Sequence, residues 1–177
     1  MAAKIDIDVD ISQVQKQIDR LQASGASMKP VLAAIGSRLT NRIKMGFRAA
    51  RSPAGIPWAP LKMRSGQPLS DTGRLKNSIT YKADDTGVEI GTNLTSTWHG
   101  ITHSIGRVHQ FGATVRPRWA PRLVFKNQIS GQTVRSMKSV IPARPFMPLN
   151  AQGDLDLPTP WKESVLDALK KHFAKGT

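Results

Sequence analysis

Three histidines that lie close together in the sequence are the first candidates for chemistry. His99 and His103 stand four residues apart, a spacing that can place two metal ligands on one face of a helix, and His109 follows. A histidine site also needs acidic groups that orient its ligands, and the stretch from Ile90 to Gln152 contains no Asp or Glu. We therefore expect ordinary surface or core histidines and no metal. A metal-dependent nuclease ranks last among the functional hypotheses.

Three carboxylates near the middle of the chain are the second candidates. Asp84, Asp85 and Glu89 could supply acid–base catalysis or bind Mg²⁺. However, Asp84 and Asp85 precede Thr-Gly in a sequence that favours a hairpin turn, so we expect solvated turn residues. The chain contains neither the nucleophile motif G-x-S-x-G nor the phosphate-binding motif G-x-x-x-x-G-K-[ST]. We therefore predict no catalytic residues and no enzymatic activity.

The positive charge of the chain is its strongest bulk signal. The formal net charge is +14, and the acidic residues avoid two long stretches, Arg20–Lys62 and Ile90–Gln152. A basic surface of this kind favours an anionic counterpart, which could be nucleic acid, a membrane face or an acidic protein, although a charge that only maintains solubility is an alternative. The candidates for an interface or a DNA-facing surface are Arg38, Arg42, Arg48, Arg51, Arg116, Arg118, Arg122 and Arg144.

Arg144 differs from the other arginines because it stands between Pro142 and Pro145. Packing alone gives no reason for a charge at this position, so we expect a salt bridge or a subunit contact. The two prolines favour an extended chain, from which Phe146 can enter a pocket.

Length and composition limit the remaining classes. The chain has 177 residues, which fits a single domain spanning residues 1–177, and it has no cysteine, which excludes disulfides and thiolate metal sites. No apolar run approaches the roughly 18–20 residues that span a bilayer, and the N-terminus lacks the apolar core of a signal peptide. We therefore expect no membrane partner and synthesis in the host cytoplasm.

The periodicity of apolar residues predicts the N-terminal elements. Alternation over Ile5–Ile11 indicates a strand with one acidic face, and a helix follows from Ser12 to about Gly25. A longer helix is predicted over 29–50, because apolar residues recur every four positions: Val31, Ile35, Leu39, Ile43 and Phe47.

The rest of the chain reads as strands, loops and one C-terminal helix, so the fold class is α+β. We predict extended loops at 52–70 and 93–112, the second ending in a short helix stopped by Gly112. Asp71 or Thr72 is expected to cap a short turn. Strands are predicted at 78–82, 87–91, near Val115, at 123–125 and at 134–141, and a helix from Thr159. A small antiparallel sheet should pack against the two long helices.

Four motifs, in order along the chain, resemble a known family. After Phe47 they read SPAGIPWAPL over 52–61, LSDTGRLKNSI over 69–79, VHQFG over 108–112 and IPARPF over 141–146. Together they resemble the phage virion morphogenesis family, which includes the tail-completion proteins of P2-like and Mu-like phages. The chain departs from the family at Ile105-Gly106, where a Tyr-Ala pair is usual, and 93–104 resembles a local insertion.

The resemblance implies an assembly role without catalysis or cofactor, in which the protein completes the tail and allows it to join the head. The residues expected to define the fold are Trp58, Leu61, Gly73, Leu75, Ile79, His109, Phe111, Gly112, Pro142, Pro145 and Phe146. Gly73 should adopt a backbone conformation that side chains disfavour, while Leu75 and Ile79 enter the core.

Tails and necks are rotationally symmetric, so a protein that completes them should form a ring through heterologous contacts. We expect a six-fold ring, with a twelve-fold ring as the alternative, located in the neck or tail of the virion. Its partners would be further copies, the tail terminator, tail-tube or neck and connector proteins, and its basic face could make non-specific contact with packaged DNA. The second-ranked hypothesis is a basic DNA-binding protein that acts outside the virion.

Overall fold

The computed structural model describes residues 27–98 and 101–175 of the chain. The predicted strand over Ile5–Ile11 and the helix that follows it lie outside these residues. The described elements are α2 (Lys29–Ala49), α3 (Arg74–Ser78), β1 (Thr80–Ala83), β2 (Val88–Gly91), β3 (Thr95–Trp98), β4 (Ile101–Ser104), α4 (Ile105–Phe111), β5 (Ala113–Val115), β6 (Leu123–Lys126), β7 (Thr133–Ser136), β8 (Ser139–Ile141) and α5 (Thr159–Lys175).

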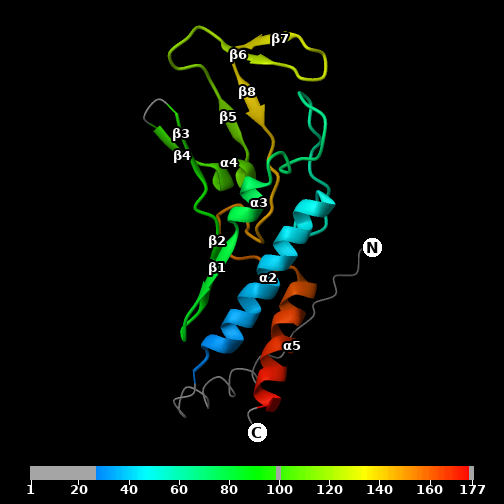
Figure 1. The fold of residues 1–177 in the computed structure, drawn as a ribbon, viewed down its shortest axis with the longest axis vertical. Coiled ribbons are helices and arrows are strands. Elements are labelled where there is room, and N and C mark those ends of the chain that lie inside the picture. Colours follow the sequence, from blue (N-terminus) through cyan, green and yellow to red (C-terminus); the bar gives the residue numbers. More distant parts are fainter. Residues whose placement is uncertain (1–26, 99–100, 176–177) are drawn as a thin grey trace, which may run out of the picture.

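The molecule is elongated, with α2, α5 and the β1–β2 hairpin at one end and β6–β7 at the other (Figure 1). The α+β class is confirmed, but the described strands form four separate antiparallel pairs instead of one small sheet. No helix in the described part of the chain is long and apolar enough to cross a membrane.

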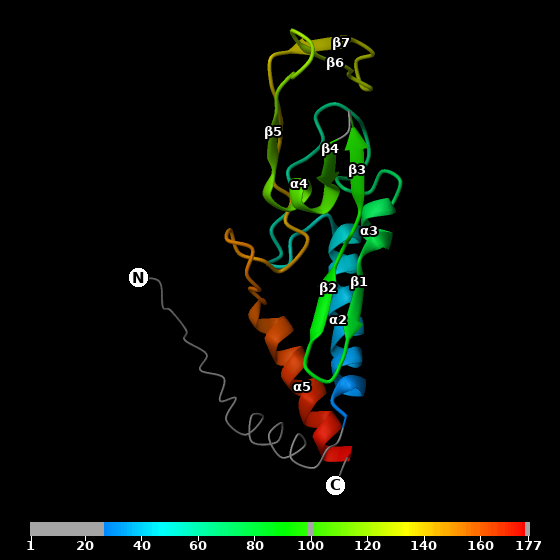
Figure 2. The same cartoon turned by 90° about the vertical axis from the view of Figure 1, so that its left-hand side faces the viewer.

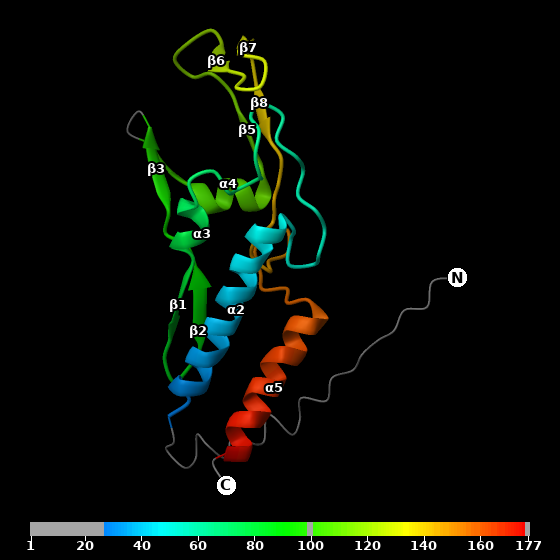
Figure 3. The ribbon, with the colours of Figure 1, turned by 45° about the vertical axis from the view of Figure 1, so that its right-hand side comes forward.

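The predicted long helix forms as α2, with Pro30 in its first turn and its apolar stripe fully buried. Helix α5 lies beside it (Figure 3), and Ala168 and Leu169 join the N-terminal half of the stripe in one buried cluster. Arg42 stacks over the ring of Trp161 at 5.9 Å and adds a cation–π contact between the two helices.

The β1–β2 hairpin covers another side of α2 (Figure 2), and its register pairs Tyr81 with Ile90. The turn forms where it was predicted: Asp84 Oδ1 accepts hydrogen bonds from the backbone of Thr86 and Gly87 at 2.7 and 2.9 Å. Helix α2 approaches this hairpin at Gly36, where an added Cβ would lie 2.5 Å from the Tyr81 ring. Glycine at this position therefore sets the distance between helix and hairpin.

A second buried cluster surrounds Phe47, whose side chain is fully buried. Trp58 meets the Phe47 ring edge-on with centroids 5.4 Å apart, and Phe146 packs on it at the same distance. Trp58 Nε1 also donates a hydrogen bond to Pro145 O at 2.8 Å. The 52–70 segment contains neither helix nor strand, and this aromatic cluster is one of the contacts that attach it to the rest of the chain.

The segment between α2 and β1 follows the expected path. Leu75 and Ile79 are buried in the second cluster, as expected. Of the two expected caps, Thr72 acts at the turn before α3, because its Oγ1 accepts a hydrogen bond from Arg74 N at 3.5 Å. The residue directly before α3 is Gly73 at φ +71°, the left-handed conformation that glycine adopts without strain.

The 93–112 segment is not the extended loop that we predicted. Strands β3 and β4 form a hairpin in which Thr97 pairs with Thr102, and α4 follows directly. The predicted short helix ending at Gly112 is confirmed. Ser104 caps it, because its Oγ accepts a hydrogen bond from Arg107 N at 3.3 Å.

Residues 113–141 form a projecting ribbon that we call the arm, and the remaining described residues form the body. In the stem of the arm, β5 pairs with β8, with Thr114 opposite Val140. At its tip, β6 pairs with β7, with Val124 opposite Arg135. The arm rises from α4 and ends far from α2 and α5 (Figures 1 and 2).

Candidate assembly interface

The arm exposes large apolar side chains on a part of the chain that has no buried core. Both buried clusters consist of body residues. Trp119 is 78% exposed, and four further apolar side chains of the arm are 61–64% exposed, namely Val124, Ile129, Met137 and Val140. Single exposed apolar residues are ordinary, but several on one short ribbon make the arm a candidate interface.

The arm also carries only positive charge. It lies within the acid-free stretch Ile90–Gln152, so no carboxylate of the arm offsets its basic side chains. All six are exposed: Arg116, Arg118, Arg122, Lys126, Arg135 and Lys138. The acidic residues of the described chain all belong to the body. The fold therefore separates the two signs of charge along its length.

The junction between arm and body is rigid at one point. Gly112 has φ +76° and ψ 171°, a conformation almost restricted to glycine. A Cβ there would lie 2.9 Å from both Ala143 N and Ile141 O, so no side chain fits between the two backbones. Between β6 and β7, Gln128 N donates a hydrogen bond to Met63 O at 2.7 Å and connects the arm to the 52–70 loop. These contacts fix the direction in which the arm projects.

Arg144 is a correction to the expected set of surface arginines. Its side chain is only 6% exposed, its Nε donates to Ala59 O at 2.9 Å, and its Nη2 donates to Pro60 O at 3.2 Å. The expected salt bridge of Arg144 is absent from the described residues. Arg144 therefore holds the 52–70 loop by its carbonyls, because the extended chain around it runs beside that loop.

The other candidate arginines of the body occupy α2 and the residues just after it. Arg38 and Arg48 are exposed on α2, while Arg42 is half-buried over Trp161. Arg51 is exposed, and its Nη1 donates to Gly55 O at 3.2 Å within its own loop. The candidate arginines Arg116, Arg118 and Arg122 belong to the arm, so the fold divides the predicted basic residues between arm and body.

The VHQFG motif acts through Gln110, a residue that we did not single out from the sequence. Gln110 is buried, its Oε1 accepts hydrogen bonds from Phe146 N and Met147 N at 3.0 Å each, and its Nε2 donates to Met147 O at 3.0 Å. One amide thus satisfies three backbone groups of the IPARPF segment and its continuation. Phe111 is 39% exposed, with Arg107 over its ring.

The two described histidines of this group differ in their element and in their burial. His103 is exposed on β4, His109 is half-buried on α4, and His99 lies outside the described residues. Burial, with the nearby Arg144 charge second, lowers the pKa of His109 below its usual 6.5. Within 27–98 and 101–175, no three His, Asp or Glu side chains gather closely enough to hold a metal ion.

Comparison with known proteins gives two matches. The profile of the phage virion morphogenesis family matches residues 9–173. A Haemophilus influenzae protein named "Mu-like prophage FluMu G protein 2" is 28% identical over 154 residues, which cover 86% of this chain and 90% of that protein. No solved structure matches.

Proposed function

The chain belongs to the phage virion morphogenesis family, and on that premise we propose that it completes the phage tail and helps to join it to the head as a structural component. The similarity to a Mu-like prophage protein along nearly its full length supports a role in phage particles. The exposed, basic and apolar arm is the observation that carries the finer proposal, because an element without its own core needs a partner to cover it.

We propose that the partner of the arm is first of all a second copy of the chain. The arm is positive, while the described acidic side chains lie on the body, notably in the β1–β2 turn and along 154–167. An arm that contacts the body of the next copy joins two different surfaces, which is the heterologous contact that closes a ring. We propose six copies, with twelve as the alternative, in the neck or at the top of the tail.

The exposed apolar side chains favour protein over DNA as the surface that covers the arm. Duplex DNA meets proteins mainly through phosphates, for which Arg and Lys suffice. Trp119 and the other exposed apolar side chains of the arm would contribute little binding free energy against phosphates. Aromatic and arginine side chains together are typical of protein–protein contacts. Contact of the body arginines with packaged DNA remains compatible with this arrangement.

Electron microscopy of lysates tests the proposed junction role. In a phage that lacks this gene, we expect separate filled heads and finished-length tails, and a plasmid copy of the gene should restore joined particles. Joined, infectious particles without the gene would overturn the proposal. Submicromolar, salt-dependent binding to duplex DNA by a protein that is absent from purified particles would support the alternative, a DNA-binding protein outside the virion.

A further inference from the structure

A pocket of about 400 Å³ opens between the 52–70 loop, α3, β3 and α4, away from the arm residues discussed above. Three arginines and one histidine line it: Arg64, Arg74, Arg144 and His109. Asp71 is the one carboxylate among the lining residues. Five aliphatic side chains complete the wall, namely Leu61, Leu69, Leu75, Leu94 and Ile105.

Arg144 brings an uncompensated charge to this pocket. Its Nε and Nη2 are held by two neutral carbonyls, and Nη1 has no hydrogen-bond partner within the described chain. Removing a guanidinium from water costs free energy that a carboxylate normally offsets by pairing with it. The carbonyls fix the orientation of Arg144 but leave its charge without a counter-ion.

His109 stands next to Arg144 and is also incompletely bonded. Its backbone carbonyl accepts a hydrogen bond from Arg144 N at 2.8 Å, and its buried Nδ1 has no hydrogen-bond partner. Buried polar atoms without partners are rare in folded proteins and call for a specific explanation. Arg144 and His109, which are joined through this backbone hydrogen bond, thus both carry a side-chain nitrogen without a hydrogen-bond partner in the described chain.

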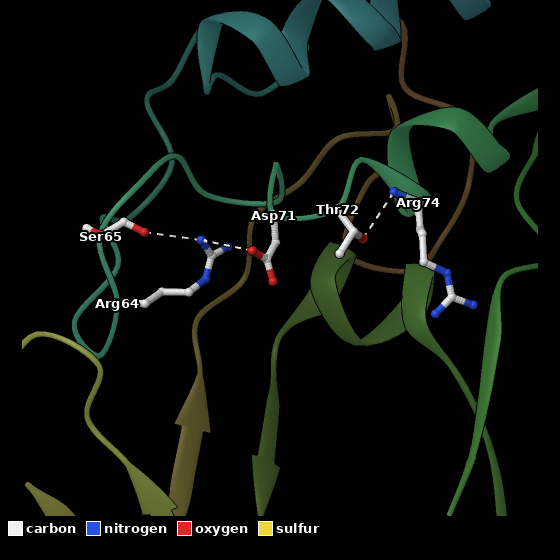
Figure 4. A network of polar contacts seen from close by, with 5 residues as sticks. All are labelled: Arg64, Ser65, Asp71, Thr72 and Arg74. Carbon is white, nitrogen blue, oxygen red and sulfur yellow. Dashed lines mark hydrogen bonds and ion pairs between the residues drawn. The ribbon is translucent and has the colours of Figure 1, made fainter. Parts of the chain in front are cut away.

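Asp71 does not supply the missing anion. It forms a loose ion pair with Arg64, with the nitrogen and oxygen 3.7 Å apart, and its side chain is 73% exposed. Figure 4 shows Asp71 beside Arg64, with Arg74 on the far side of Thr72 and its guanidinium directed away from Asp71. Arg64 also donates to Ser65 O at 3.2 Å, which holds it near Asp71.

We propose that this pocket binds the carboxylate of an Asp or Glu side chain from a partner protein. A guanidinium with a free edge binds a carboxylate through parallel hydrogen bonds, and the aliphatic wall fits an apolar residue beside that carboxylate. A duplex phosphate fits worse, because Arg144 is 6% exposed and lies below the surface that a DNA backbone can touch. Binding of a carboxylate in this pocket does not depend on the proposed ring.

The test uses the full chain and two blocked peptides, acetyl-Leu-Glu-Leu-amide and acetyl-Leu-Gln-Leu-amide. We expect the Glu peptide to shift the NMR signals of the His109 ring and Arg144 Nε–H with saturation, with a Kd on the order of 1 mM. The Gln peptide should cause no saturable shift. Equal binding of both peptides, or no binding of either, would overturn the proposal. Equal saturation by inorganic phosphate would replace it with a general oxyanion site.

Surface variants around the pocket sharpen the test without disturbing Arg144. Asp71→Asn frees Arg64 for the peptide. It should tighten binding about twofold to fivefold, the change in affinity expected when one exposed ion pair no longer competes with the peptide. Arg64→Gln should weaken binding by a similar factor. Arg38→Gln removes an exposed arginine of α2, outside the residues that line the pocket, and should change nothing. If Asp71→Asn has no effect, or if Arg38→Gln weakens binding as much as Arg64→Gln, the site is not this pocket.

Discussion

Helix α2 of the body turns an apolar residue inward about every fourth position, whereas the strands of the arm turn Val124 and Val140 toward solvent. The body contains both buried clusters and all described acidic side chains, and the arm contains exposed apolar groups and unopposed positive charge. The difference shows that the body is stabilised from within, and it is the basis of our proposal that the arm contacts another molecule.

The largest expected effect concerns the body core. Phe47→Ala should lower the free energy of unfolding by about 3–5 kcal/mol, because it removes a fully buried ring on which Trp58 and Phe146 both pack. Urea unfolding measures this change. Val124→Ala in the arm is the matched control and should stay within about 0.5 kcal/mol. A comparable loss in both variants would show that the arm has a core of its own.

The second comparison uses two glycines that share a positive φ. Gly112→Ala at the base of the arm should cost at least about 2 kcal/mol, because its backbone conformation excludes side chains and a Cβ meets two backbone atoms at 2.9 Å. Gly131→Ala in the arm, at φ +71° with open space around it, should cost about 1 kcal/mol. Thermal unfolding measures the loss of stability in both variants. Equal losses would contradict a tightly packed base and an open tip of the arm.

The third effect separates association from stability. Trp119→Ala should leave the unfolding midpoint unchanged, since the side chain is 78% exposed, and should weaken self-association by about tenfold or more. Leu155→Ala, which truncates a 69% exposed apolar residue of the body, is the control and should leave association intact. Light scattering over a concentration series measures both. Loss of association in the control alone would place the interface on the body.

The smallest effect is the pH dependence that His109 contributes. Its pKa is lowered in the folded chain, so the unfolded chain binds more protons, and stability falls as the pH drops below about 6.5. His109→Phe cannot bind a proton and should remove this part of the decline. Unfolding curves at neutral and mildly acidic pH compare the two proteins. An identical pH dependence in both would show that His109 is not desolvated.

The sequence was informative where a local period or a turn residue determines the structure. The four-residue spacing of apolar side chains predicted α2, and Asp84 with Gly87 predicted the first hairpin, because both depend on neighbouring residues. The β3–β4 hairpin was missed, because Thr95-Ser96-Thr97 and Thr102-His103-Ser104 lack an apolar alternation.

The role of Arg144 could not be predicted, because its hydrogen-bond partners, the carbonyls of Ala59 and Pro60, lie about 85 residues away along the chain. Gln110 is similar, since its amide bonds to backbone groups 36 and 37 residues further on. The composition predicted a basic partner surface, but only the fold shows which arginines project on the arm and which stay on the body.

Hydrogen–deuterium exchange on the free protein and on purified phage particles tests the contrast between body and arm most directly. We predict that amides of α2 are protected in both samples, while those of β6 and β7 exchange rapidly in the free protein and become protected in particles. An arm that is as protected in the free protein as the body, or that stays unprotected in particles, would contradict the claim that the arm is the assembly interface.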